Sequence, residues 1–71
     1  MKFLVTGATG FIGRHLIRQL HASGHAVRAM VRPTSDTTGF PVGIEYAHAT
    51  LEDADALARA VAGVDAVVHL A

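Results

Sequence analysis

Three glycines stand at a regular spacing near the start of the chain, in the segment Thr6-Gly-Ala-Thr-Gly-Phe-Ile-Gly13. The segment joins a short apolar run to a pattern typical of a helix, so we expect it to form the turn between them. In such a turn Gly7 adopts a positive φ, Gly10 lets the backbone approach a pyrophosphate, and Gly13 lets the helix pack closely on the strand. The free N–H groups at the start of the helix then point at the anion. We therefore predict a phosphate-binding turn formed by Gly7, Thr9, Gly10, Phe11, Ile12 and Gly13.

Two other interpretations of this turn need weighing. Glycine-rich turns often serve only tight packing, and the pattern alone does not separate that role from ligand binding. The order of strand, turn, helix and second strand, at the spacing of a βαβ unit, favours dinucleotide binding. A Walker-type phosphate loop is excluded, because no Gly-Lys-Ser/Thr triplet occurs and Lys2 is the only lysine.

A second chemical signal lies at the end of the apolar run from Ala26 to Val31. An NAD site places Asp or Glu there, about 20 residues past the glycines, to bind the ribose hydroxyls. No acid occurs before Asp36, and Arg32 directly follows the run. A guanidinium suits a 2'-phosphate, and Thr34 and Ser35 offer hydroxyl donors. The sequence therefore predicts NADP in preference to NAD, with a solvated strand-end arginine as the alternative.

The other residue types that bind metals or carry catalysis give weaker signals. The chain has no cysteine, and its five histidines are scattered along it, so we expect no metal site. His69 stands near the end of the last apolar run. There it either borders the ribose of a cofactor or packs as an ordinary strand histidine.

These residues are positioned by strands and helices that alternate along the chain. Short apolar runs rich in strand formers alternate with two stretches whose apolar residues recur every three or four positions. This alternation predicts an open parallel α/β sheet, because parallel strands need crossovers that cover the faces of the sheet. The expected strands are Lys2 to Thr6, Ala26 to Val31, Ile44 to His48 and Ala66 to Ala71, and the expected helices are Phe11 to Ser23 and Leu51 to Ala62.

Each expected helix has an apolar face. In the first helix Ile12, Leu16 and Leu20 share one side, while Arg14 and Arg18 share the opposite, polar side. In the second helix the apolar face comprises Ala54, Leu57, Ala58 and Val61. Residues 34–43, rich in Thr, Gly and Pro, are expected to form a loop.

Composition limits the classes of partner. Six Lys and Arg balance six Asp and Glu in 71 residues, and no basic cluster is present, so we expect neither nucleic acid nor an anionic membrane as a partner. Hydrophobic residues make up 51% of the chain, yet no apolar stretch approaches the roughly 18 residues that span a bilayer. The absence of cysteine suits the reducing cytoplasm, where we expect the protein to reside.

Two segments resemble a known family. They are Val5-Thr-Gly-Ala-Thr-Gly-Phe-Ile-Gly13, with the spacing Gly-x-x-Gly-x-x-Gly, and Val64-Asp-Ala-Val-Val-His-Leu-Ala71. Both resemble the extended short-chain dehydrogenase/reductase family, the NAD(P)-dependent epimerase/dehydratase group. The resemblance implies a Rossmann-type sheet with strand order 3-2-1-4, and it places Leu70 and Ala71 at the cofactor site. The segment from Val27 to Pro33 is similar to the reductase-like branch of the family.

The resemblance also indicates what these residues lack. The family's catalysis uses a Tyr-x-x-x-Lys pair with a Ser or Thr, whereas the only Tyr and Lys here are Tyr46 and Lys2. We therefore expect residues 1–71 to be the N-terminal part of an NAD(P)-binding Rossmann domain, with an incomplete sheet, no catalytic residue and no substrate domain. The parent is expected to be a reductase, epimerase or dehydratase, with a homodimer as one expected assembly, acting on a sugar nucleotide or a small carbonyl or alcohol. The alternative is a non-catalytic NADP-binding module that senses redox state or binds a partner.

One position departs from the family pattern. The family often has an Asp just after its third strand, near the adenine, and the corresponding residue here is Thr50. We expect Thr50 to cap the second helix instead.

Overall fold

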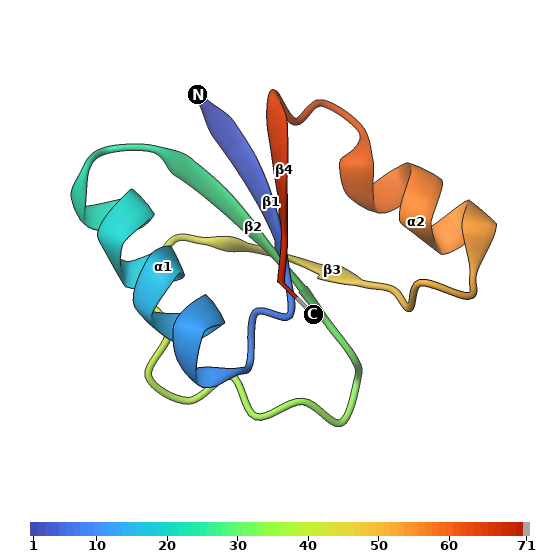
Figure 1. Cartoon of the computed structure of the whole chain (residues 1–71), viewed down its shortest axis with the longest axis horizontal. Helices are drawn as coiled ribbons and strands as arrows, with labels where there is room; N and C mark the ends of the chain where they lie inside the picture. Colours follow the sequence, from blue (N-terminus) through green and yellow to red (C-terminus); the bar gives the residue numbers. More distant parts are fainter. Residues whose placement is uncertain (71) are drawn as a thin grey trace.

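The computed structural model describes residues 1–70, and the predicted cofactor residue Ala71 lies outside the described residues. Strands and helices alternate along the chain (Figure 1), as the sequence predicts. The elements are β1 (Lys2–Thr6), α1 (Phe11–Ala22), β2 (Ala26–Val31), β3 (Glu45–His48), α2 (Ala54–Val61) and β4 (Ala66–His69).

The four strands form one parallel sheet in the order β3-β2-β1-β4, which confirms the predicted topology. β1 is an interior strand, in which Leu4 lies opposite Arg28 of β2 on one side and opposite Val67 of β4 on the other. Leu4 and Val5 are fully buried, as expected for a strand that is covered on both faces. Because the strands are parallel, their carboxyl ends lie along one edge of the sheet.

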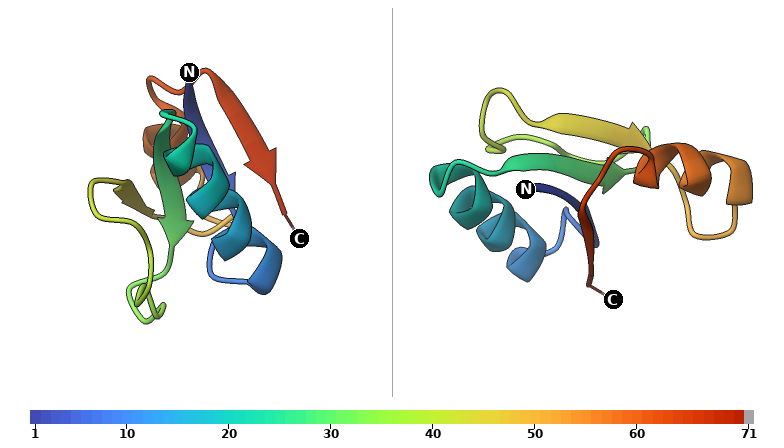
Figure 2. Two further views of the ribbon diagram at one scale, coloured as in Figure 1. Left: turned by 90° about the vertical axis from the view of Figure 1, so that its left-hand side faces the viewer. Right: turned by 90° about the horizontal axis from the view of Figure 1, so that it is seen from above.

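The two helices cover opposite faces of the sheet, as the turned views in Figure 2 show. On one face Ile17 of α1 is fully buried against Val5 and the apolar side of β2. On the other face α2 packs Ala56 and Ala60 against Leu4. This two-layered covering accounts for the apolar character of β1 and leaves the carboxyl edge of the sheet uncovered by either helix.

The start of α2 differs from the prediction. The helix begins at Ala54 rather than Leu51, because the Asp53 side chain accepts a hydrogen bond of 3.0 Å from the N–H of Ala56. The preceding residues form a turn, closed by a 3.3 Å hydrogen bond from the Asp53 N–H to the Thr50 carbonyl. Asp53 is therefore the cap, and the prediction that Thr50 caps the second helix is wrong.

The other boundaries shift by a residue or two. α1 ends at Ala22, and Gly24 follows it with a φ of 86°, the left-handed conformation that favours glycine. β3 begins at Glu45 rather than Ile44, and β4 ends at His69, because each strand is confined to the stretch paired with its neighbour.

The predicted apolar faces are only partly right. Leu16 and Leu20 pack against the core, but Ile12 is 68% exposed, because the first turn of α1 lines an opening near the carboxyl edge of the sheet. In α2 the buried side consists of Ala56 and Ala60, whereas Ala54 and Ala58 are exposed and Val61 is 39% exposed. Small residues on the buried side let the helix approach the sheet closely, and the cap at Asp53 sets its first turn.

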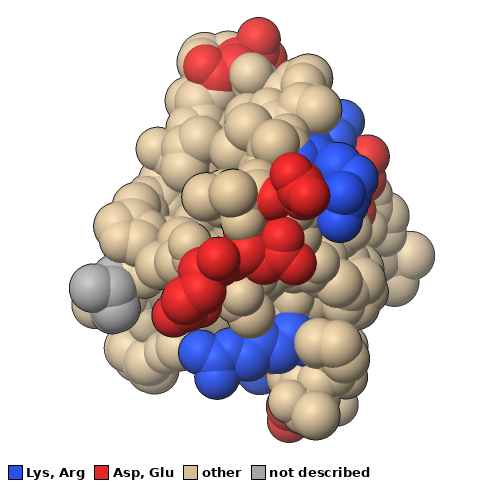
Figure 3. Space-filling view, turned by 90° about the vertical axis from the view of Figure 1, so that its right-hand side faces the viewer, with Lys and Arg blue, Asp and Glu red and all other residues tan. Residues whose placement is uncertain are grey.

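Acidic and basic side chains are interspersed on the face that carries α2 (Figure 3). Two basic residues form ion pairs with Glu45: the Lys2 Nζ lies 2.6 Å from Glu45 Oε2, and an Arg28 nitrogen lies 3.7 Å from the same oxygen. Lys2, followed by the smaller effect of Arg28, lowers the pKa of Glu45 from its ordinary value. Within residues 1–70 no helix combines the length and the apolar character that crossing a membrane requires.

Candidate functional site

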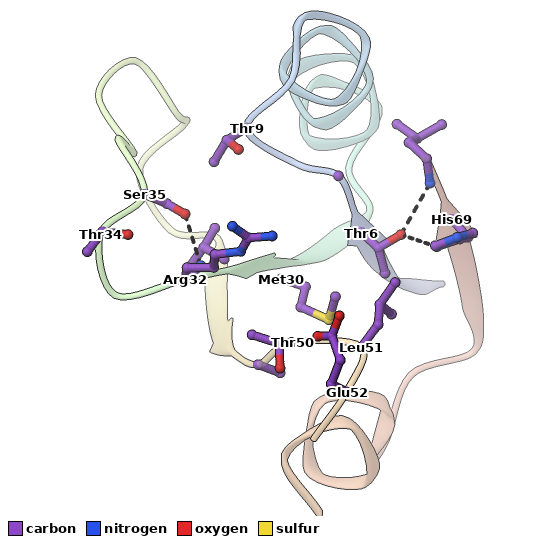
Figure 4. A pocket seen from close by; sticks show the side chains of 14 residues that line it. Thr6, Thr9, Met30, Arg32, Thr34, Ser35, Thr50, Leu51, Glu52 and His69 are labelled. Carbon is purple, nitrogen blue, oxygen red and sulfur yellow. Dashed lines mark hydrogen bonds between the residues drawn. The ribbon is translucent and has the colours of Figure 1, made fainter. Parts of the chain in front are cut away.

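A pocket of about 540 Å³ opens at the carboxyl edge of the sheet (Figure 4). Its walls come from the glycine-rich turn, from the end of β2 with the loop that follows, from the segment after β3, and from the end of β4. The lining residues are Thr6, Gly7, Thr9, Met30, Val31, Arg32, Thr34, Ser35, Ala49, Thr50, Leu51, Glu52, His69 and Leu70. Ligands of open parallel sheets bind at this edge, where the strand order reverses next to the first strand.

Two of the three glycines are required by the fold itself. Gly7 has a φ of 65°, and a Cβ placed on it would lie 2.2 Å from the Leu70 carbonyl oxygen. A Cβ on Gly13 would lie 2.3 Å from the Gly7 carbonyl oxygen, so this glycine lets α1 rest on the turn. Gly10 differs, because its Cβ would meet only the Gly7 oxygen, at an ordinary 3.4 Å. The protein's own packing therefore does not explain Gly10, which leaves open space at the start of α1.

The first turn of α1 is open to an anion. Its N-cap, Gly10, provides no side-chain acceptor, and the turn contains no acidic residue. α2 shows the opposite arrangement, since Asp53 caps it and Asp55 lies in its first turn. The partial positive charge at the start of α1 is thus uncompensated by the protein's own carboxylates, as an anion-binding helix requires.

A second opening, of about 410 Å³, lies on the other side of the glycine-rich turn. It is lined by Gly7, Gly10, Phe11, Ile12, Gly13, His69 and Leu70. Gly7, His69 and Leu70 line both openings, so the two hollows meet at the turn. Every described residue that the sequence assigned to the cofactor lines one or both of them.

The ends of β1 and β4 are joined by the hydroxyl of Thr6. Its Oγ1 lies 2.6 Å from His69 Nδ1 and accepts a 3.2 Å hydrogen bond from the Leu70 N–H. Thr6 is 4% exposed, whereas His69 is an exposed residue of β4 that borders both openings. The sequence analysis missed Thr6, for which the only signal is a hydroxyl residue at the end of an apolar strand.

Arg32 lies at the mouth of the larger pocket, directly after β2. Figure 4 shows its guanidinium between Thr9 on one side and Met30 on the other. The backbone around it is held by a local turn, in which the Arg32 N–H donates to Ser35 Oγ at 2.9 Å and the Ser35 N–H donates to the Arg32 carbonyl at 3.0 Å. Within residues 1–70 the ion pairs involve Glu45, and Arg32 takes part in neither of them.

The segment after β3 contributes polar groups to the floor of the pocket. Thr50 lines it, as does Glu52, which the sequence analysis did not single out because one exposed acid in an acidic stretch carries no signal. Within residues 1–70 no three His, Asp or Glu side chains come together as a possible metal site.

A parallel sheet with a glycine-rich turn and an uncompensated helix start at its carboxyl edge defines a nucleotide-binding α/β domain. A family model described as NAD(P)H-binding matches residues 7–71. The chain belongs to this family, and its relatives are short-chain dehydrogenase/reductase proteins of the epimerase/dehydratase group, as the sequence predicts.

Three relatives illustrate the likeness. Sterol demethylase protein B from Methylococcus capsulatus is 40% identical over 72 residues, which span 100% of this chain and 22% of that protein. A nucleoside-diphosphate-sugar epimerase from Pseudomonas aeruginosa superposes with a TM-score of 0.89 at 34% identity, covering 99% of this chain and 24% of that one. UDP-glucose 4-epimerase from Thermus thermophilus, solved in complex with NAD, gives a TM-score of 0.84 at 32% identity, covering 100% and 24%. The chain thus spans about a quarter of the length of these relatives.

Proposed function

We propose that residues 1–70 form the part of an NADP(H) site that holds the adenosine 2'-phosphate and the pyrophosphate. The observation that carries the proposal is Arg32, which lies at the mouth of the pocket after β2. Within residues 1–70 Arg32 forms no ion pair with a carboxylate. A carboxylate at the end of β2 would accept hydrogen bonds from ribose hydroxyls and repel a 2'-phosphate, whereas a guanidinium attracts it. Thr34 and Ser35 line the same pocket and add hydroxyl donors for the phosphate oxygens.

The two openings suit the two halves of a dinucleotide. The larger one accommodates the adenosine half, and the pyrophosphate crosses the turn at Gly10, over the free amides of the first turn of α1. The other half then extends toward the second opening, past Gly7 and Leu70, which border both hollows. Burial of the adenosine and the charge of the helix start together support this orientation.

The reaction that we propose for the protein is hydride exchange between a nicotinamide and a carbon–oxygen centre, in a reductase, epimerase or dehydratase. When bound, the cofactor supplies the hydride chemistry. The described residues bind and orient it, and they do not contain the Tyr-x-x-x-Lys pair that the family uses for proton transfer. The relatives named above differ in the substrates that their names carry, yet they share this segment, which supports a role in the common cofactor rather than in substrate choice. A sugar nucleotide or a small carbonyl or alcohol is the substrate class that we propose.

The test is the affinity of the protein for NADPH and for NADH, by calorimetry, with and without Arg32→Ala at two ionic strengths. A charge-assisted hydrogen bond contributes about 1.5 to 3 kcal/mol, so NADPH binding should weaken by roughly one to two decades while NADH binding stays nearly constant. The NADPH preference should also shrink with added salt, which screens a surface phosphate over about 8 to 10 Å.

Arg18→Ala is the matched control, since Arg18 is an exposed arginine of α1 that lines neither opening. It should leave both affinities unchanged. Equal losses of NADPH and NADH affinity in Arg32→Ala would show that Arg32 supports the strand or the shared adenosine, and the assignment of NADP would have to be withdrawn.

A further inference from the structure

Arg14, the residue directly after the third glycine, joins the glycine-rich turn to the loop that follows β2. Its Nε donates a 3.0 Å hydrogen bond to the Thr9 carbonyl within the turn. Its Nη1 donates to the Thr38 carbonyl at 2.8 Å, and its Nη2 donates to the Asp36 carbonyl, both in the loop. The guanidinium carbon also lies 4.8 Å from the centre of the Phe40 ring. From the sequence Arg14 belongs to the polar side of the first helix, but in the structure its guanidinium is hydrogen-bonded to three backbone carbonyls.

Apart from Arg14, the loop is held by Phe40, which packs against the core and whose ring centre lies 6.1 Å from that of Tyr46. Its remaining hydrogen bonds are local: besides the two between Arg32 and Ser35, the Thr38 N–H donates to Asp36 Oδ1 at 2.9 Å, and the Phe40 N–H donates to the Thr37 carbonyl at 3.3 Å. Hydrogen bonds from the Thr38 side chain and from the Thr38 N–H to the Asp36 carboxylate lower the pKa of Asp36 from its ordinary value. Among the hydrogen bonds of the described residues, those from Arg14 alone connect residues 33–39 to another element.

The two segments that Arg14 connects both contribute walls to one pocket. Thr9 belongs to the wall formed by the glycine-rich turn, and Arg32 and Ser35 belong to the wall formed by the loop. In the proposed complex the pyrophosphate lies at the first wall and the 2'-phosphate at the second. The pyrophosphate and the 2'-phosphate are attached to the same ribose, so the covalent structure of the cofactor limits the distance between them. The two walls must be spaced to match that distance.

We infer that Arg14 is a positioning residue that fixes the spacing between the pyrophosphate and 2'-phosphate walls and thereby sets the preference for NADP(H) over NAD(H). The inference rests on the proposed function. A loop that is already ordered loses less conformational entropy when the cofactor binds. The resulting gain in affinity goes to NADP(H), which contacts both walls. NADH, which lacks the 2'-phosphate, gains little from an ordered loop.

The side-chain chemistry explains why an arginine is needed here. Three carbonyl oxygens from two segments surround one planar group, and a guanidinium can donate to all of them from its fixed fork. A lysine carries the same charge on a single ammonium at the end of a flexible stem. Charge alone therefore does not substitute for Arg14, which separates a positioning role from direct attraction of the phosphate.

The experiment compares Arg14→Met, Arg14→Lys and the control Arg18→Ala in the intact protein. Arg14→Met retains an apolar stem over Phe40 and loses the donors, so it preserves the fold better than truncation to alanine. We expect both Arg14 variants to weaken NADPH binding about tenfold and NADH binding by less than about twofold, with Arg18→Ala unchanged. Without cofactor, amide hydrogen exchange in residues 34–40 should be faster in both Arg14 variants and unchanged in the control.

A double-mutant cycle with Arg32→Ala locates the effect. If Arg14 acts through the wall that carries Arg32, Arg14→Met should cost little further NADPH affinity once Arg32 is absent. Additive losses, rescue by Arg14→Lys, equal losses for both cofactors, or unchanged exchange in the loop would each overturn the inference. If Arg32→Ala weakens NADPH and NADH binding equally, both the proposed function and the inference are overturned. If Arg32→Ala weakens NADPH binding selectively but Arg14→Met weakens both equally, the inference alone is overturned.

Discussion

Gly13 and Gly10 should respond to substitution in opposite ways, although both belong to the same motif. At an exposed helical position, Gly→Ala stabilises a protein by about 1 kcal/mol. A Cβ on Gly13, however, would lie 2.3 Å from the Gly7 oxygen and 2.9 Å from two backbone atoms of Ala8. Ordinary C···O contacts are roughly 3.3 to 3.6 Å, so α1 would have to move about 1 Å from the turn.

The net cost of Gly13→Ala follows from these two effects. Overpacking against backbone atoms, which cannot rotate away, lies at the upper end of the usual range, about 3 kcal/mol. After the helical gain of about 1 kcal/mol, we expect Gly13→Ala to lower the free energy of unfolding by about 2 kcal/mol. Urea unfolding measures this directly. An increase in stability, as at an ordinary helical glycine, would refute the argument that Gly13 serves the contact between helix and turn.

Gly10→Val is the matched variant within the same motif. Its backbone, with φ −73° and ψ 170°, is open to any residue, and its Cβ meets only the Gly7 oxygen at 3.4 Å. We expect a stability loss of about 1 kcal/mol or less, from a poorer N-cap. The branched side chain would occupy the space above the free amides, and losing two charge-assisted hydrogen bonds of about 1.5 kcal/mol each weakens binding by about two decades.

This loss should be the same for NADPH and NADH, because both contain the pyrophosphate. Calorimetry on Gly10→Val and Gly13→Ala, with urea unfolding of each, therefore separates binding from stability. Unchanged cofactor affinity in a folded Gly10→Val protein would refute the assignment of the pyrophosphate to this turn.

Substitutions at three further positions test how the edges of the site are built. Thr6→Val removes the hydroxyl that bonds His69 and the Leu70 N–H, and the loss of these two partly buried hydrogen bonds should cost about 1 to 3 kcal/mol in urea unfolding, whereas Thr6→Ser should retain most of the stability. Asp53→Ala should lower stability by about 1 kcal/mol through the lost cap, and Thr50→Ala by less than about 0.5 kcal/mol. Thermal unfolding that ranks these last two in the reverse order would restore Thr50 as the cap.

Local sequence patterns were sufficient to predict the structure where the conformation of a residue depends on its neighbours in the chain. β2 occupies Ala26–Val31 as predicted, because an apolar run bounded by Gly24 and Pro33 has few other ways to fold. The strand order followed from the resemblance to a family. The roles of Gly7 and Gly13 followed from the strand–turn–helix context. The structure confirms the positive φ of Gly7 and the close approach at Gly13, although the helix there meets Gly7 and Ala8 of the turn rather than the strand.

The sequence-based predictions were wrong or incomplete in two situations. In one, two nearby residues are equally suited to cap a helix; in the other, a contact joins segments that are distant in the sequence. Thr50 and Asp53 are both acceptable caps, and only the path of the chain after β3 decides between them. Arg14 looked like a solvent-facing helix residue, because a hydrogen bond to a carbonyl more than twenty positions away leaves no trace in local periodicity. Thr6 and His69 meet for the same reason, across 63 positions of sequence.

The pairing of β1 with β4 has a consequence for how the molecule is made. A ribosome adds about 5 to 20 residues per second, so β4 follows β1 after roughly 3 to 12 seconds of translation. β2 is available to β1 much sooner, but the other edge of β1 keeps its N–H and C=O groups unpaired until Ala66–His69 has emerged. β1, whose Leu4 and Val5 are fully buried in the folded sheet, is therefore paired on one side only until β4 has been made. His69 pairs with the end of β1, and His69 and Leu70 also line both openings, so the pairing of β4 with β1 and the placing of these two wall residues occur together.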